Sequence, residues 1–361
     1  MKTIAYKKNT DETIERLCLL YLRRAQNQIF ARFDVPNKTI GKFREENPEG
    51  FCDYPDPHER ITFWDACLKE RMDVEDDSIP SAYLSEFDQA LYGALVGGEA
   101  QFMSHDNGWI SSMVSPILKD WTDFDALYLG ENHIWHQRYL DQLECFASGS
   151  KDKFGISHFI LIDGLNFAFE LVGATKTYES LIDSQDMIKR TIDFAYDLNV
   201  RVQETFFDNT PTFRDGTFSN MVQWVPGRIV SESLDPFHMT SVDYFEEWGR
   251  ENVERMFGHF DGGVVHLHGN GRHLLEATCT IKGLKAIWLG DDIGFPQAFD
   301  VLNDLRKRAD DMPLVTSVEF DDFAKRLAMH DLPGGVLYQV SGCPDADTAN
   351  RYMDQVRGYR I

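Results

Sequence analysis

The sequence predicts an α/β protein, a single (β/α)8 TIM-type barrel with an N-terminal helical extension. Two observations favour this fold. The chain has 361 residues, which suits one large α/β domain. In its C-terminal part, short apolar runs alternate with helix-like segments, a pattern typical of parallel βαβ units. A doubly wound open sheet is the alternative. The apolar runs cover 263–267, 286–290, 313–316 and 335–340, and the helical segments cover 271–281, 295–309, 319–330 and 346–358.

The N-terminal part is predicted to be largely helical. Apolar residues recur at helical spacing over 11–33, and residues 58–73 repeat the pattern. The segment between them is rich in proline, glycine, asparagine and charge, which is typical of a surface loop. We therefore divide the chain into a helical extension over 1–57, packed on the barrel, and the barrel itself over 58–361.

The middle of the chain supplies further elements of the predicted barrel. Residues 158–164 are expected to form a strand that runs into a loop, and two helices follow at 165–182 and 185–207. Residues 101–121 are predicted to be irregular with short strands, and 208–224 are predicted to be a loop. These two segments carry no readable motif.

Charge and composition argue against several classes of partner and substrate. A net charge of −23 argues against a nucleic acid or an anionic membrane as partner, because both need a basic surface. It also disfavours a highly anionic substrate, unless a local basic pocket overrides the mean. No apolar run approaches the length of a membrane span, and the N-terminus lacks the apolar core of a signal peptide. We therefore expect a cytoplasmic protein, whose six scattered cysteines are thiols.

Two histidines stand at the end of a predicted strand. Residues 263–270 (Gly-Val-Val-His-Leu-His-Gly-Asn) form an apolar run that ends in a short loop. Because alternate side chains of a strand share a face, His266 and His268 point the same way. Parallel α/β folds bind ligands at the carboxyl ends of their strands, and two imidazoles there form half of a transition-metal site. The alternative is one core histidine beside one polar loop histidine.

The same stretch carries a family resemblance. The segment from His266 to Asn270 resembles the His-x-Cys-Gly-Asn motif of the uroporphyrinogen decarboxylase superfamily, within it the zinc-dependent, cobalamin-linked methyltransferases. Near the C-terminus, a Gly-Cys segment ending at Cys343, followed by Thr348 and Asn350, is similar to a second block of that family. Looser matches lie at 76–80 and 231–248.

The chain departs from the family in three places. The loop between Cys343 and Asn350 is shorter than in the family. His268 stands where the methyltransferases have their first cysteine. The arginine motif by which the decarboxylases grip a tetracarboxylate is absent, and Arg23-Arg24-Ala25-Gln26 is a poor substitute. The resemblance therefore implies a barrel with its site at the carboxyl ends of the strands, and it favours methyl transfer over porphyrinogen decarboxylation.

The resemblance also implies a zinc site made of His266, His268 and Cys343. A catalytic zinc ion takes three protein ligands and keeps a fourth position open. A thiol or another nucleophile bound there has a lowered pKa and reacts more readily. The alternative keeps Cys343 as a buried thiol in the final turn.

Acidic residues near predicted strand ends are further candidates. In the decarboxylases an aspartate of the block matched by Asp76 and Asp77 faces the substrate, so the resemblance implies a catalytic role for this pair. Paired carboxylates can transfer protons, bind a cationic group or support a metal. Glu232, as a catalytic residue, and Asp235, as a substrate-binding residue, are similar candidates after another strand. A solvated acidic loop is the alternative for all of them.

Other side chains are expected to bind substrate, although each has an ordinary structural alternative. Aromatic residues can wall a pocket but are more often core, and a histidine or an asparagine near a strand end can face the barrel mouth. The candidates are Trp109, His158, Trp224 and Asn270.

These residues lead to three expected functions. The first is a zinc-dependent methyltransferase that moves a methyl group between a small substrate or thiol and a corrinoid held by a separate protein. The second is a metal-independent carboxy-lyase that uses Asp76 or Asp77. The third is a catalytically silent barrel that binds a tetrapyrrole or corrinoid. The family also leaves a homodimer open.

Overall fold

Parallel strands form the centre of the molecule, in a computed structural model that describes residues 3–48, 50–130 and 133–361. Six of them make one sheet in which every neighbouring pair is parallel. Strands of such sheets are buried on both faces, which is why they appear in the sequence as short apolar runs. Their order is β1 (Ile29–Phe33), β13 (Val336–Ser341), β12 (Leu314–Glu319), β11 (Leu284–Leu289), β10 (Gly263–Leu267) and β9 (Val230–Ser233).

The remaining strands form two smaller sheets. One is antiparallel and forms the part of the chain that was predicted to be irregular with short strands. The other is parallel except for its last strand. The first contains β2 (Phe51–Cys52), β4 (Ala100–Ser104) and β5 (Ile110–Val114), and the second contains β3 (Ser81–Tyr83), β6 (Gly155–His158), β7 (Gly216–Ser219) and β8 (Gln223–Pro226).

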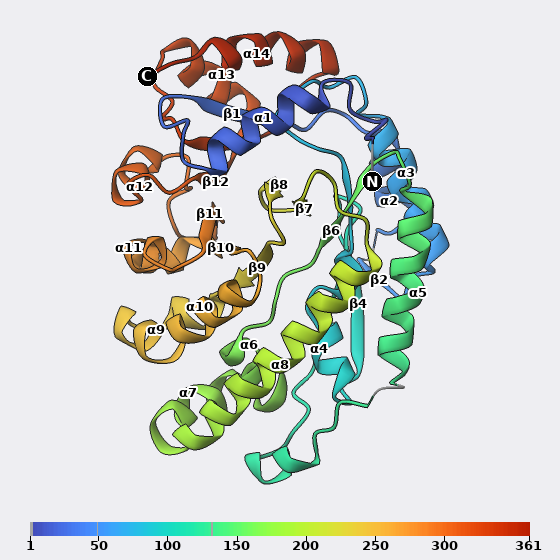
Figure 1. Cartoon of the computed structure of the whole chain (residues 1–361), viewed down its shortest axis with the longest axis vertical. Helices are drawn as coiled ribbons and strands as arrows, with labels where there is room; N and C mark the ends of the chain where they lie inside the picture. The colour runs from blue at the N-terminus through green and yellow to red at the C-terminus, as the bar shows by residue number, and fades with distance from the viewer. Residues whose placement is uncertain (1–2, 49, 131–132) are drawn as a thin grey trace.

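Backbone contacts join the two parallel sheets on both sides. A parallel bridge pairs Leu161 with Glu232 of β9, and the Leu161 N–H donates to the Ser231 carbonyl at 2.7 Å. On the opposite side, the Asp77 N–H donates to the Ala31 carbonyl of β1 at 2.8 Å. The strands therefore follow a continuous curve (Figure 1), an arrangement compatible with a barrel-like α/β fold.

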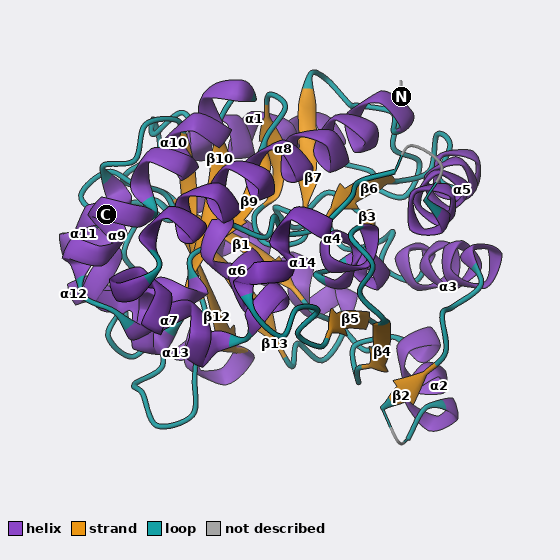
Figure 2. Cartoon of the chain, turned by 90° about the horizontal axis from the view of Figure 1, so that it is seen from below, coloured by secondary structure: helices purple, strands orange, loops and turns teal. Residues whose placement is uncertain are grey.

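Helices surround the strands, except that α1 packs with the β7 and β8 hairpin (Figures 1 and 2). Within the described ranges, no helix combines the length and apolarity needed to cross a membrane. The helices are α1 (Thr10–Tyr21), α2 (Lys38–Glu46), α3 (Pro57–Lys69), α4 (Ala90–Leu95), α5 (Ile134–Gly149), α6 (Gly164–Val172), α7 (Ala174–Asp183), α8 (Gln185–Asn209), α9 (Val242–Trp248), α10 (Arg250–His259), α11 (Leu275–Cys279), α12 (Leu302–Arg308), α13 (Phe320–Ala328) and α14 (Ala346–Gly358).

The hairpin of β7 and β8 lies inside the curve of the strands (Figure 1). The sequence analysis expected a loop over 208–224, and the structure corrects this. Trp224, expected in a pocket wall, is 1% exposed and donates through Nε1 to the Phe213 carbonyl at 2.9 Å. Its ring covers Gly216 so closely that a Cβ there would lie 2.2 Å away. The hairpin fills the interior together with buried side chains of α1 and of alternate strand positions, namely Leu17, Leu20, Phe30, Val264, Ala286, Val315 and Leu337.

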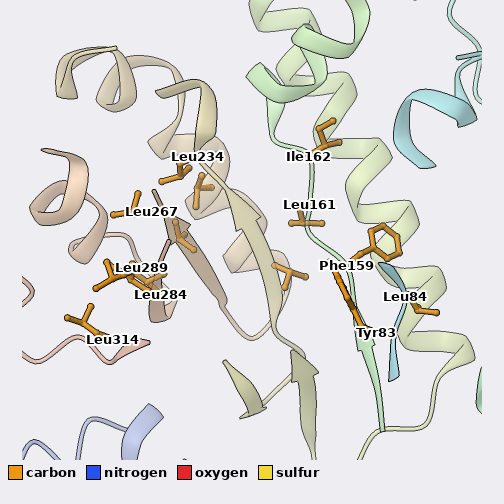
Figure 3. Close-up of a cluster of buried hydrophobic side chains, with 14 of the residues drawn as sticks. Tyr83, Leu84, Phe159, Leu161, Ile162, Leu234, Leu267, Leu284, Leu289 and Leu314 are labelled. Carbon is orange, nitrogen blue, oxygen red and sulfur yellow. The ribbon is translucent and has the colours of Figure 1, made fainter. Parts of the chain in front are cut away.

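The opposite faces of the strands pack against the helices. Because successive strand residues point to opposite faces, the neighbours of the interior residues belong to a different buried cluster. Figure 3 shows part of this cluster, with side chains of the C-terminal strands and their loops on one side and of β3 and the segment after β6 on the other. The labelled members from the C-terminal strands and loops are Leu234, Leu267, Leu284, Leu289 and Leu314.

The N-terminal part differs from the prediction at residues 22–33. Helix α1 ends at Tyr21, Arg23 adopts a left-handed φ of 58°, and Ile29–Phe33 forms β1. Pairing with β13 decides this, because five consecutive residues of β1 find parallel partners there. Helical spacing of apolar residues is a weaker signal than such tertiary pairing. Residues 1–57 thus contribute a strand to the main sheet as well as helices.

Candidate functional site

Two histidines of the β10 end share a face, as the sequence predicts. Val265 and Leu267 belong to the cluster that packs on the helices, so His266 and His268 point the other way. Their ring centroids are 5.1 Å apart. His266 is 4% exposed and also contacts the ring of Trp288 on β11, with centroids 6.1 Å apart.

A carboxylate joins the two imidazoles. Asp235, in the loop after β9, has its Oδ1 2.8 Å from His266 Nε2 and 3.8 Å from His268 Nε2. The possible ligand atoms of the three residues all lie within 4.8 Å of one another. Two histidines and one carboxylate form a common ligand set for zinc and other divalent transition metals. We call Asp235, His266 and His268 the candidate metal group.

A second carboxylate orients His268. Asp292, in the loop after β11, has its Oδ1 2.9 Å from His268 Nδ1, and its Oδ2 accepts the Asn270 N–H at 3.3 Å. Burial opposes ionisation of Asp292, but these hydrogen bonds lower its pKa. A carboxylate on the far nitrogen fixes the ring of a metal-ligating histidine, so Nε2 remains the nitrogen that faces Asp235.

Charge in the group favours the ionised form of Asp235. Burial opposes ionisation, but His266, His238 and His268 together lower the pKa of this carboxyl. Burial likewise disfavours a charged His266, whereas Asp235 raises its pKa, and the net shift is upward. The site therefore keeps the Asp235 carboxylate ionised next to imidazoles, and this combination of groups is suited to hold a metal cation.

Further carboxyl groups surround the candidate metal group. Burial raises the pKa of Asp163, which caps α6, to about 7, and raises the pKa of Asp88 to about 6. Glu232 is 1% exposed, and burial raises its pKa strongly, with a further contribution from Asp163. His266 lowers the pKa of both aspartates, which places them within electrostatic reach of that histidine.

Asp163, Glu232 and Asp88 each keep a buried oxygen free of hydrogen bonds to the described residues. The sequence analysis named Glu232 and left out Asp88 and Asp292 as site residues. Asp163 follows a strand and precedes a helix, a position that can mark such a site. Asp292 follows the predicted strand 286–290 and carries the same signal, whereas Asp88 carries no comparable signal, because only the fold brings its loop to this place.

Asp76 and Asp77 occupy ion pairs between β1 and the segment before β3. Asp77 receives two hydrogen bonds from Arg16 of α1, at 2.5 and 2.9 Å. Asp76 lies 3.0 Å from Lys7 and 3.2 Å from Arg71. Burial opposes ionisation of Asp76, but Lys7 and Arg71 lower its pKa. These contacts give both carboxylates a structural role, and their catalytic role stays a prediction.

Cys343 lies outside the candidate metal group. It follows β13, is 1% exposed, and its Sγ is 3.6 Å from the Asp345 carbonyl. Its N–H donates to the Asp34 carbonyl at 3.2 Å, next to the end of β1. Burial raises the pKa of its thiol. Of the three predicted zinc ligands, the structure brings together His266 and His268. Asp235 takes the third position, for which the sequence predicts Cys343.

The predicted substrate-binding residues lie in different surroundings. His158 is fully buried, its Nε2 is 2.8 Å from Ser231 Oγ, and burial lowers its pKa to about 4. The Asn270 N–H donates to Asp292, which also contacts His268 of the candidate metal group. Trp109 lines a cavity of about 420 Å³.

Comparison with known proteins identifies the fold but no family. No protein-family model matches the chain, and no curated protein matches it. Among solved structures it is similar to a methyltransferase from Methanosarcina mazei, with a TM-score of 0.62 and 13% identity over 98% of this chain and 99% of that chain. At this identity the likeness establishes a shared fold over the full length of both chains.

Proposed function

We propose that this protein is a metal-dependent methyltransferase of the uroporphyrinogen decarboxylase type, which moves a methyl group between a small substrate or thiol and a corrinoid on a separate protein. The observation that carries the proposal is the candidate metal group at the carboxyl ends of β9 and β10. Two further points support it: parallel α/β folds bind ligands at this end, and the similar solved structure is a methyltransferase.

The residues of the group fit a zinc ion. Asp235, His266 and His268 would hold it, and Asp292 would fix the ring of His268. Such an ion, when bound, lowers the pKa of a thiol or hydroxyl in its open position and so makes a nucleophile at neutral pH. We assign the proton of that nucleophile to the buried carboxyl of Asp163, whose pKa burial raises to about 7.

The carboxy-lyase alternative finds less support. It needs Asp76 or Asp77 free to steady a protonated intermediate, and both hold structural ion pairs with Lys7, Arg71 and Arg16. A catalytically silent barrel is tested by the metal measurement below.

The first test is the metal content of the purified protein, by elemental analysis of protein prepared without chelators. We expect about one zinc per chain in the wild type and in Cys343→Ala, and a loss of metal in His268→Ala. His273→Ala is the matched control, because His273 is an exposed histidine of the same segment bonded only to backbone carbonyls among the described residues.

Each other outcome has a definite meaning. Absence of metal from the wild type would contradict the proposal and favour a silent barrel. Loss of metal in Cys343→Ala would show that the metal-bound protein uses Cys343 after all. With metal established, methyl transfer would be followed by the visible absorbance of an added corrinoid protein, with methylated thiols and alcohols as donors.

A further inference from the structure

A basic cavity lies next to the ends of β1 and β3 in this otherwise acidic protein. Its volume is about 420 Å³, within the range of small-molecule sites. Three arginines and one aspartate line it, Arg32, Arg44, Arg71 and Asp34, although the whole chain has a net charge of −23. None of the residues of the candidate metal group belongs to its lining.

Arg32 has N–H donors that make no hydrogen bond to the described residues. It projects from β1 and its side chain is 30% exposed. Its one hydrogen bond to the described residues goes from Nη2 to Asp34 at 2.9 Å. A guanidinium has five N–H donors in a planar fork, so donors remain for a carboxylate. Arg71, by contrast, is engaged by the Phe33 carbonyl at 2.7 Å and by Asp76 at 3.2 Å.

Two buried polar atoms of lining residues have no partner in the part of the chain that the structure describes. Trp64 is 6% exposed, and its Nε1, a donor, is unpaired. Asn220, at the tip of the hairpin of β7 and β8, has an unpaired Oδ1. Buried polar atoms are nearly always hydrogen-bonded, so a polar ligand in the cavity would find one donor and one acceptor here.

The remaining walls suit an apolar body. The rings of Tyr83 and Trp109 meet edge to face with centroids 4.9 Å apart, and both line the cavity. The Tyr83 hydroxyl donates to Asp88 at 2.5 Å, and Asp88 is within electrostatic reach of His266. The Tyr83 hydroxyl thus connects the cavity wall to the buried carboxyl of Asp88.

We propose that this cavity binds a small organic acid, with its carboxylate on Arg32, an N–H from Trp64, and its apolar part against the paired rings of Tyr83 and Trp109. A monocarboxylate matches the lining, because Asp34 and Asp76 offset part of the arginine charge and leave little for a dianion. The inference stands apart from the proposed function, since it uses no residue of the candidate metal group.

The test is isothermal titration of the full-length protein with benzoate and with butyrate. We expect binding to the wild type that weakens about tenfold or more in Arg32→Gln, because a charge-assisted pair is removed. Arg23→Gln is the matched control: Arg23 pairs with Asp311 at the same 2.9 Å and has a similar exposure of 34%. The affinity of the Arg23→Gln variant for benzoate and butyrate should equal that of the wild type.

Three results would overturn the proposal: no carboxylate binding by the wild type, unchanged affinity in Arg32→Gln, or tighter binding of inorganic phosphate, which would change the ligand class. The titration is repeated on protein stripped of metal with a chelator. Unchanged binding places the carboxylate in the cavity whether or not the proposed function holds, whereas lost binding would place it on the metal and contradict the assignment.

Discussion

Asp163 and Glu232 bury two carboxyl groups next to each other without a salt bridge among the described residues. Burial penalises the charged form of both, and Asp163 further raises the pKa of Glu232. Burial therefore favours the protonated form of both carboxyl groups relative to exposed ones. Protonated carboxyl groups near His266 can donate protons at the candidate site.

The proton on Asp163 makes stability depend on pH. The pKa of this carboxyl is about 7 in the folded protein and about 3.9 in an unfolded chain. Between these values the folded state binds more protons, so the free energy of unfolding falls as pH rises from about 4 to about 7. We expect Asp163→Asn to flatten this fall, measured by urea unfolding at several pH values.

The substitution keeps the side-chain oxygen that accepts the Asn166 N–H at the start of α6. Asp193→Asn, whose carboxylate is 72% exposed and paired with Arg255, is the control and should reproduce the wild-type profile. A profile of Asp163→Asn parallel to that of the wild type would mean that Asp163 is ionised throughout.

At the scale of elements, α1 and the segment before β3 hold the free edge of β1. Arg16 reaches from α1 to Asp77 with two hydrogen bonds, and Asp77 Oδ2 accepts the Ala31 N–H of β1 at 3.0 Å. Asp76 Oδ2 accepts the Phe33 N–H at 2.9 Å. Carboxylates thus satisfy backbone donors of β1 on the side opposite β13.

Removing one member of this buried pair should cost considerable stability. In Asp77→Ala the Arg16 guanidinium stays buried without its partner, and such a loss typically costs about 3–5 kcal/mol. Chemical denaturation of the purified variant measures it. Lys8→Met, which breaks the exposed pair with Asp73, is the control and should change stability little. Equal stability of the two variants would show that the junction does not stabilise the fold.

At the scale of the whole molecule, the N-terminal part is built into the central sheet and the interior cluster. β1 pairs with β13 along five residues, and α1 packs in the interior cluster with the hairpin of β7 and β8. The division at residue 57 stays a prediction, and the contacts across it indicate that the parts are not independent.

Truncation checks this division. We expect a fragment of residues 58–361 to lose cooperative unfolding, because deletion exposes the edge of β13 and the interior residues that α1 covers. Circular dichroism and thermal unfolding of the fragment, compared with the full chain, provide the measurement. A fragment with the native spectrum and a sharp transition would support an extension that merely packs on the barrel.

The sequence by itself determined the C-terminal strands and the paired histidines. Runs at 263–267 and 335–340 are apolar because strands covered on both faces need apolar side chains, and β10 and β13 occupy these positions. The common face of His266 and His268 follows from strand geometry alone. These features are local, so a single stretch of sequence contains all the information they need.

Only the tertiary structure decided which residues join those histidines. Asp235 and Asp292 come from the loops after β9 and β11, which parallel pairing places on either side of β10. The same packing put Trp224 in the interior, turned residues 29–33 into a strand and left Cys343 beside Asp34. Contacts between distant segments depend on strand order and register, and neither spacing nor composition encodes them in any one stretch.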